Sequence, residues 1–264
     1  MIDTHTHLYL TDYTEDDPEG CAKAVDRAVG AGVGLMILPA VDRESCPLIA
    51  DLHARRPDAT FTAMGIHPTE VEEDWREELA EIVAALRPTA PVAIGEVGID
   101  RHYGDGNLPL QKEAFTAQLL LAAEEKLPVI IHCRDAVEEC CGCIVEARRL
   151  NGDRPFPTLV FHSFTGTPAD VRRIREVCDP YFGINGVVTF KNSGEVPQAV
   201  AEIGIGRIVL ETDSPWLAPV PKRGRRNESA YIPFINDKIA EVLSLSADEV
   251  AATTTRNAKE IFGI

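Results

Sequence analysis

Short apolar or β-branched runs alternate along the chain with longer polar stretches rich in Ala and Glu. Eight such runs lie at residues 1–8, 33–40, 61–68, 91–99, 128–134, 158–164, 181–190 and 207–215. Stretches such as 19–32, 76–87, 111–126 and 168–178 lie between them and are long enough for crossover helices. This alternation is typical of repeated βα units. Eight units favour an α/β fold of the TIM type, a closed (β/α)8 barrel, over an open doubly wound sheet.

The whole chain, residues 1–264, is expected to form one domain. Its 264 residues, 45% of them hydrophobic, suit a single α/β barrel, and no low-complexity linker or break in composition divides them. Ser246 and Glu249 have the spacing of a capping box, so the tail 246–264 is predicted to be a capped helix packed against the barrel.

The sequence shows neither a signal peptide nor an apolar run of membrane-spanning length, so we expect a cytoplasmic protein with no membrane partner. Its 42 acidic and 26 basic residues give a formal net charge of −16. This charge opposes long-range attraction to nucleic acid, so a polyanionic partner would require a local basic patch.

The seven cysteines are expected to be reduced thiols, because their number is odd and no export signal precedes them. Cys140, Cys141 and Cys143 form a cluster that suggests a metal site at first sight. Their spacing does not match paired CxxC ligands, which favours buried thiols on a helix.

Residues of the types that ligate metals lie where five of the eight predicted strands end. They are His5, His7, Glu96, His132, His162 and Asp213. In a barrel of this type the carboxyl ends of the strands form the active-site mouth. Residues two apart on a strand share a face, so His5 and His7 are expected to point into the mouth and Thr6 away from it.

Each of these residues has a structural alternative. A single strand histidine such as His132 is more often a core residue with satisfied hydrogen bonds. Five strand ends together are harder to explain in that way, because every buried unpaired His, Asp or Glu costs free energy. Imidazole and carboxylate ligands suit Zn²⁺, Mn²⁺, Mg²⁺ or related ions. Six ligands exceed the needs of one tetrahedral ion, so we expect two divalent cations that share a carboxylate.

Seven short motifs carry a family resemblance along essentially the whole chain. They are DTHTHL at 3–8, GIHP at 65–68, GEVGID at 95–100, IIHCRDA at 130–136, HSFTG at 162–166, ETDSPWLAP at 211–219 and RGRRNESAY at 223–231. In this order they resemble the TatD-type metal-dependent deoxyribonucleases of the amidohydrolase superfamily. The resemblance implies a distorted (β/α)8 barrel and metal-dependent hydrolysis of nucleic-acid phosphodiesters, often from the 3′ end.

The same resemblance implies how the ligands are shared between two cations. One cation would be surrounded by His5, His7, Glu96 and Asp213, and the other held by Glu96, His132 and His162, with Glu96 as the bridge. Two cations about 3.5–4 Å apart lower the pKa of a bound water to about 7 and stabilise the attacking and leaving oxygens. We therefore expect Asp213 to be the catalytic base, with a role as ligand alone as the alternative.

Two further residues are predicted to contact substrate at the mouth. His67 ends the third strand and is not needed for either metal, so we expect it to contact phosphate or a metal ligand; its alternative is a strand-end cap made rigid by Pro68. Arg134 lies two residues after His132 on the same face. Its guanidinium suits either a phosphate or a carboxylate beside the metal ligands.

A local basic patch follows the eighth predicted strand, with Lys222, Arg223, Arg225 and Arg226 within five residues. Such runs are usually solvated surface, but this one lies beside the predicted metals and could bind phosphates. Arg223 and Asn227 match the family motif and are the preferred substrate contacts. The absence of an extensive basic groove favours a short or single-stranded nucleic-acid end.

One segment departs from the family pattern, which commonly has aromatic residues directly after the aspartate of GEVGID. Here Asp100 is followed by Arg101, His102 and Tyr103. The change leaves the metal ligands intact and concerns the pocket wall that would stack on a base or sugar. His102 is expected either to contact substrate or, preferably, to lie in a loop.

Three functions are compatible with the sequence. The first is a metal-dependent phosphodiesterase or exonuclease acting on DNA, and also RNA, ends. The second keeps the metals but cleaves an amide or a D-aminoacyl-tRNA ester, because fold and ligands alone do not select the bond. The third is a non-catalytic scaffold in which metal only stabilises the fold. The basic loop favours the first, and the complete ligand set disfavours the third.

Overall fold

A computed structural model describes residues 1–15, 17 and 19–264. Eight parallel strands form one sheet in the order of the sequence, β1 to β8. They are β1 (Ile2–Asp3), β2 (Leu35–Pro39), β3 (Thr60–Met64), β4 (Ala93–Asp100), β5 (Val129–Arg134), β6 (Leu159–Phe161), β7 (Tyr181–Ile184) and β8 (Ile208–Leu210). Each falls within or overlaps one of the eight predicted runs. The predicted (β/α)8 fold is confirmed.

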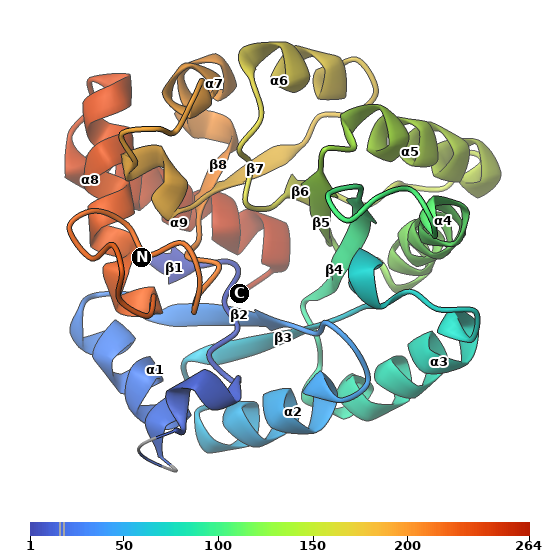
Figure 1. The fold of residues 1–264 in the computed structure, drawn as a ribbon, viewed down its shortest axis with the longest axis horizontal. Helices are drawn as coiled ribbons and strands as arrows, with labels where there is room; N and C mark the ends of the chain where they lie inside the picture. The colour runs from blue at the N-terminus through green and yellow to red at the C-terminus, as the bar shows by residue number, and fades with distance from the viewer. Residues whose placement is uncertain (16, 18) are drawn as a thin grey trace.

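Helices surround the strands as an outer ring (Figure 1). The α-helices are α1 (Gly20–Gly30), α2 (Ser45–Arg55), α3 (Trp75–Leu86), α4 (Leu108–Glu125), α5 (Val137–Asn151), α6 (Pro168–Arg175), α7 (Val196–Ile203), α8 (Ile232–Leu243) and α9 (Ala247–Phe262). Short 3₁₀ helices lie at η1 (Thr11–Tyr13), η2 (Pro68–Glu70), η3 (Arg87–Thr89), η4 (Gly186–Thr189), η5 (Ile205–Arg207) and η6 (Ser229–Tyr231). Within the described residues, none of these helices has the length and hydropathy to cross a membrane.

The barrel has a seam between β8 and β1. This irregularity agrees with the distorted barrel that the family resemblance implied. Successive strands up to β8 are joined by ladders, whereas β1 and β8 are joined by separate hydrogen bonds. The amide of Thr4 donates to the carbonyl of Leu210 at 2.9 Å, and the amide of Asp213 donates to that of His5 at 3.0 Å. The segments that carry His5 and Asp213 are therefore fixed to each other across the seam.

The first strand is shorter than expected. We predicted that His5 and His7 close a strand, but β1 ends at Asp3. The Asp3 carboxylate accepts hydrogen bonds from the amides of His5 at 3.3 Å and Thr212 at 3.0 Å, which bends the following chain toward the β8 loop. Even so, the two histidines share a side, because their Nε2 atoms lie 3.1 Å apart.

The inside of the barrel is filled by one buried side chain from each strand, together with three residues of α9. These residues are Ile2, Ile37, Ala63, Ala93, Ile130, Val160, Tyr181, Val209, Ala258, Ile261 and Phe262. Because α9 packs against this layer, it closes the base of the barrel and leaves the carboxyl ends of the strands open. The predicted capping box is confirmed: Ser246 accepts from the amide of Glu249.

The cysteines conform to the expectation of free thiols. All seven are free, and Cys140, Cys141 and Cys143 are buried on α5. Burial raises the pKa of each of these three thiols, which keeps them protonated. They therefore serve as small apolar side chains in the packing of α5 against the barrel.

Candidate metal centre and active site

Glu96 lies in β4 at the centre of the open end of the barrel. The pairing of β4 with β5 shifts register between Ile94 and Val97, so the strand is irregular where Glu96 leaves it. At Gly98, which has a φ of 150°, a Cβ would collide with the carbonyl oxygen of His132. Glycine at this position lets β4 and β5 approach closely, and so brings Glu96 and His132 together.

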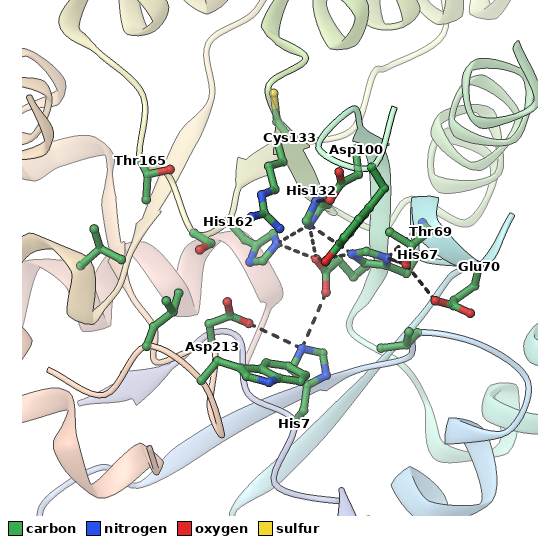
Figure 2. Close-up of a pocket in the computed structure, with 18 residues that line it drawn as sticks. His7, His67, Thr69, Glu70, Asp100, His132, Cys133, His162, Thr165 and Asp213 are labelled. Carbon is green, nitrogen blue, oxygen red and sulfur yellow. Dashed lines mark hydrogen bonds and ion pairs between the residues drawn. The ribbon is translucent and has the colours of Figure 1, made fainter. Parts of the chain in front are cut away.

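The two carboxylate oxygens of Glu96 face two different sets of imidazoles. Oε2 lies 3.1 Å from Nε2 of His5 and 3.7 Å from Nε2 of His7. Oε1 lies 2.8 Å from Nδ1 of His132 and 2.6 Å from Nε2 of His162. Figure 2 shows His7, His132 and His162 turned toward the same centre. One carboxylate therefore joins two ligand sets from four strands and loops.

Asp213 lies at the edge of this cluster, nearer to solvent. Its Oδ1 atom is 3.8 Å from Nε2 of His5 and 3.7 Å from Nε2 of His7, and its side chain is 16% exposed. The residue has a φ of 55°, a left-handed conformation that turns the chain directly after β8. Asp213 is thus placed between the buried histidines and the cavity.

The surroundings of the cluster shift the pKa values of its two carboxylates, Glu96 and Asp213, in opposite directions. Burial would raise the pKa of Glu96, but the imidazoles of His162 and His5 outweigh it and hold that pKa well below its usual value. Burial raises the pKa of Asp213. Although burial opposes charge on His162, Glu96 raises the pKa of this imidazole well above its usual value. Glu96 is therefore the permanent anion, and Asp213 is the carboxyl with greater proton affinity.

Three further side chains orient the histidines. Nε2 of His132 lies 2.9 Å from Oδ2 of Asp100, and Nδ1 of His7 lies 2.8 Å from the hydroxyl of Tyr9. Nδ1 of His162 faces Oε1 of Glu211 at 3.7 Å. Such contacts select which imidazole nitrogen is turned toward the cluster. The sequence analysis did not assign these three residues. The available signals were the positions of Asp100 in the strand of Glu96 and of Glu211 two residues before Asp213.

Glu211 is completely buried, and β7 makes room for it. A Cβ at Gly183 would collide with the Glu211 carboxylate, so any larger residue there would force this carboxylate to move. Oε1 of Glu211 accepts a hydrogen bond from the amide of Ser163, while Oε2 has no hydrogen-bond partner among the described residues. Glu211 therefore connects the β8 loop to the segment that follows His162.

His67 lies closer to the cluster than the sequence analysis expected. Its Nε2 atom is 3.4 Å from Oε1 of Glu96 and 3.2 Å from Nδ1 of His132. Its Nδ1 atom also accepts from the amide of Thr69, so it caps the short helix η2 as well. His67 thus lies at the mouth as predicted and also acts as the cap that was its alternative. It is additionally placed to bind a cation.

The cluster fits divalent cations by the chemistry of its donor atoms. Three groups have ligand atoms within 4.8 Å of one another: His5, His7 and Glu96; His5, His162 and Asp213; and His67, Glu96 and His132. Several imidazole nitrogens converge on one carboxylate, more than its two oxygens can satisfy well through hydrogen bonds. Nitrogen and oxygen donors at this density are what Zn²⁺, Mn²⁺ and similar ions require. The residues therefore form a cluster able to bind metal.

The cluster opens into a cavity of about 840 Å³. Residues that line it include His67, Arg134, Tyr103 and Trp216. The Arg134 side chain is exposed, with its guanidinium carbon 5.9 Å from the centre of the Tyr103 ring. Arg134 is therefore accessible to a phosphate at this wall, as the sequence analysis expected.

The loop after β8 places the two preferred substrate contacts, Arg223 and Asn227, in different surroundings. Asn227 is completely buried: its Nδ2 atom donates to the carbonyls of Thr212 at 2.9 Å and Trp216 at 2.6 Å, and its Oδ1 atom accepts from the amide of Glu228 at 3.0 Å. The side chain of Asn227 is thus bonded within the protein and is not among the residues that line the cavity, and its contact with substrate stays a prediction. Its side chain is used to hold the segment that contains Asp213 and Trp216.

Two exposed arginines of the same loop, Arg223 and Arg226, stack on aromatic rings. The guanidinium carbon of Arg223 lies 3.9 Å from the ring centre of Phe190, and that of Arg226 lies 4.5 Å from Tyr13. Arg223 is not among the residues that line the cavity. Cation–π contacts thus fix these charges on the outer rim. Arg223 can meet a substrate there, beyond the cavity and away from the cluster.

The segment that departs from the family pattern forms part of the loop between β4 and α4. Arg101 pairs with Asp105 at 2.7 Å and Glu139 at 2.8 Å, while His102 lies outside the main cavity with its Nδ1 atom 3.6 Å from Asp135. Tyr103 is 79% exposed and lines the cavity. An aromatic ring is therefore still present at this wall, supplied by the third residue after Asp100.

An eight-stranded barrel with a cluster of His, Glu and Asp at its open end defines the class of metal-dependent hydrolases. A family model described as TatD related DNase matches residues 2–263. The chain is 35% identical over 266 residues to YabD of Bacillus subtilis, an uncharacterized metal-dependent hydrolase, with 100% of this chain and 99% of that protein covered.

A second relative is the 3′-5′ ssDNA/RNA exonuclease TatD of Erwinia tasmaniensis, 32% identical over 277 residues with 100% of both chains covered. Among solved structures, the TatD homologue YjjV of Escherichia coli has a TM-score of 0.87 at 26% identity, with 100% of this chain and 98% of that chain covered. The chain belongs to the TatD family, and it is a metal-dependent hydrolase.

Proposed function

We propose that the protein is an exonuclease that hydrolyses phosphodiester bonds at single-stranded ends of DNA, and also of RNA, with two divalent cations. The observation that carries this proposal is that the two carboxylate oxygens of Glu96 face separate sets of histidines at an open cavity. The names of relatives such as the Erwinia tasmaniensis exonuclease support nucleic acid as the substrate.

The proposed ligand sets follow the oxygens of Glu96. His5, His7 and Asp213 would hold one cation on the Oε2 side, and His132 and His162 the other on the Oε1 side. His67 is a candidate additional ligand on that second side. When bound, the cations supply Lewis-acid activation of water and neutralise negative charge on the phosphate.

The residues of the chain complete the chemistry. Asp213 lies at the edge of the cavity, with its side chain 16% exposed, so its carboxylate is placed to accept a proton from the attacking water. Arg134 faces the cavity and would bind a phosphate oxygen with its planar guanidinium. Arg223, on the rim, would contact the strand farther from the cleaved bond.

The proposal is tested with single-stranded DNA labelled at its 5′ end, incubated with Mg²⁺, Mn²⁺, Co²⁺ or Zn²⁺. We expect a ladder that shortens from the 3′ end, no cleavage in a chelator, and arrest at a phosphorothioate placed near the 3′ end. Asp213→Asn should lose activity. A matched control is Asp58→Asn, an exposed carboxylate just before β3 and thus at the closed end of the barrel.

The same assay includes other bonds that such a cluster could attack, namely an amide in a dipeptide and the ester of a D-aminoacyl-tRNA. Fold and ligands do not distinguish these substrates from DNA. If the protein leaves DNA and RNA intact with every cation and cleaves one of the others, the proposed nuclease function is wrong. The assignment to metal-dependent hydrolases would stand.

A further inference from the structure

Trp216 is a large aromatic residue that the folded chain leaves half exposed beside the metal cluster. Its side chain is 52% exposed and lines the cavity. The ring of His7 lies against it in a T-shaped arrangement, with ring centres 5.3 Å apart. The other tryptophan, Trp75, is buried at 3% exposure. Tryptophan is enriched at binding surfaces because it combines a large apolar ring with a polar N–H group.

The backbone of Trp216 is held firmly in place. Its amide donates to the carbonyl of Asp213 at 3.1 Å, and its carbonyl accepts from Nδ2 of Asn227 at 2.6 Å. These two bonds fix the backbone of Trp216, and the ring of His7 packs against the indole. Part of the ordering of this residue is therefore in place before substrate binds, which lowers the entropic cost of a contact.

We propose that Trp216 stacks on the base of a nucleotide adjoining the scissile phosphate, and that this contact selects ends whose bases are unpaired. This inference rests on the proposed nuclease function. Every base has a flat π-face, so stacking tolerates any sequence, but the face is available only where the base can leave its neighbours. A paired and stacked base inside a duplex does not meet that condition.

The opposite wall of the cavity favours the same class of substrate. Tyr103 follows β4 and Trp216 follows β8, and these strands are four places apart in the strand order β1 to β8. The two rings therefore stand on opposite sides of the barrel mouth, and both line the cavity. Tyr103 is approached by Arg134 and His102. Trp216 packs instead against His7, a member of the cluster, and has the larger ring; Trp216 is therefore the ring assigned to stacking beside the scissile phosphate.

The test compares three single-stranded oligonucleotides that differ only near the 3′ end. One is intact, one lacks the base of the last nucleotide, and one lacks the base of the nucleotide before it. The wild-type protein should cut one of the two abasic substrates about tenfold to hundredfold more slowly, in kcat/KM, than the intact one. In Trp216→Ala the two rates should become nearly equal, while Trp216→Phe should retain part of the preference.

The ratio of rates within each variant is the readout, because loss of the indole also removes a contact with His7 and changes the absolute rate. Val220→Ala is the matched control, since Val220 is 45% exposed in the same loop and is not among the cavity residues. Its ratio should equal that of the wild type.

Tryptophan fluorescence gives a second readout that does not depend on turnover. In Trp75→Phe, Trp216 is the one remaining tryptophan of two. An uncleavable oligonucleotide with phosphorothioate linkages at its 3′ end should quench this emission, and the abasic version should quench it less. Equal quenching by both would contradict stacking.

The two proposals fail in different ways. If the wild type cuts none of the three oligonucleotides with any cation, the nuclease function is wrong and the inference about Trp216 falls with it. If the wild type cuts all three equally, or Trp216→Ala keeps the wild-type ratio, the stacking contact is wrong while the nuclease function stands.

Discussion

Asn227 offers the sharpest contrast between a substrate contact and a structural role, and Asn227→Ala separates the two. The substitution removes two hydrogen bonds to the carbonyls of Thr212 and Trp216 and one from the amide of Glu228. At about 1 kcal/mol each, their loss lowers the free energy of unfolding by about 3 kcal/mol. For a domain of this size, that change corresponds to a drop in Tm of about 6–12 °C.

The assay is thermal unfolding followed by circular dichroism, with kinetics measured well below the lower Tm. Because Asn227 fixes the segment carrying Asp213, kcat should fall along with Tm. Asn192→Ala, a change at an exposed turn residue, serves as the control and should leave both unchanged. A normal Tm with a raised KM for DNA would refute the structural role and support Asn227 as a substrate contact.

Three other perturbations test separate parts of the site. Glu96→Gln removes the shared anion, so calorimetric titration with Mn²⁺ should show at least a tenfold loss of affinity for both cations; loss of only one would contradict the bridge. Arg134→Ala should raise KM for DNA and reduce the slope of log KM against log salt by about one; an unchanged slope would exclude a phosphate contact. The raised pKa values of Asp213 and His162 imply that protons compete with cations, so metal affinity should fall as the pH is lowered, with proton release measured in buffers of different ionisation enthalpy. Affinity independent of pH would contradict this competition.

The fold, and the meeting of the expected ligand residues at one mouth, could be predicted because they depend on local pattern. Each βα unit has a recognisable alternation of a short apolar strand and a longer helical stretch. Eight such units in succession favour a closed barrel. Once the barrel is assumed, the carboxyl ends of its strands meet at one mouth. The positions of Glu96 and His132 near the ends of their strands then predict that the two side chains lie close together. His5 and His7 were also placed correctly on one side, although the strand that was to hold them ends at Asp3.

The contacts that the sequence analysis did not predict are between segments distant in sequence. Asn227 resembles a polar surface residue until the chain folds its side chain beneath Trp216. The contact of Glu211 with Ser163 depends on the absence of a side chain at Gly183. His67 follows a strand as expected, but its distance to Glu96 is set by the irregular path of β4. None of these relations has a periodic signal.

Whether Glu96 joins two cation positions can be seen in an anomalous difference map of crystals grown with Mn²⁺ or Zn²⁺. We predict two peaks, one beside Oε2 and the His5 and His7 side chains, the other beside Oε1 and the His132 and His162 side chains. Elemental analysis of the same protein should give about two ions per chain. A single peak, or peaks that do not contact Glu96, would show that this carboxylate does not bridge two cations.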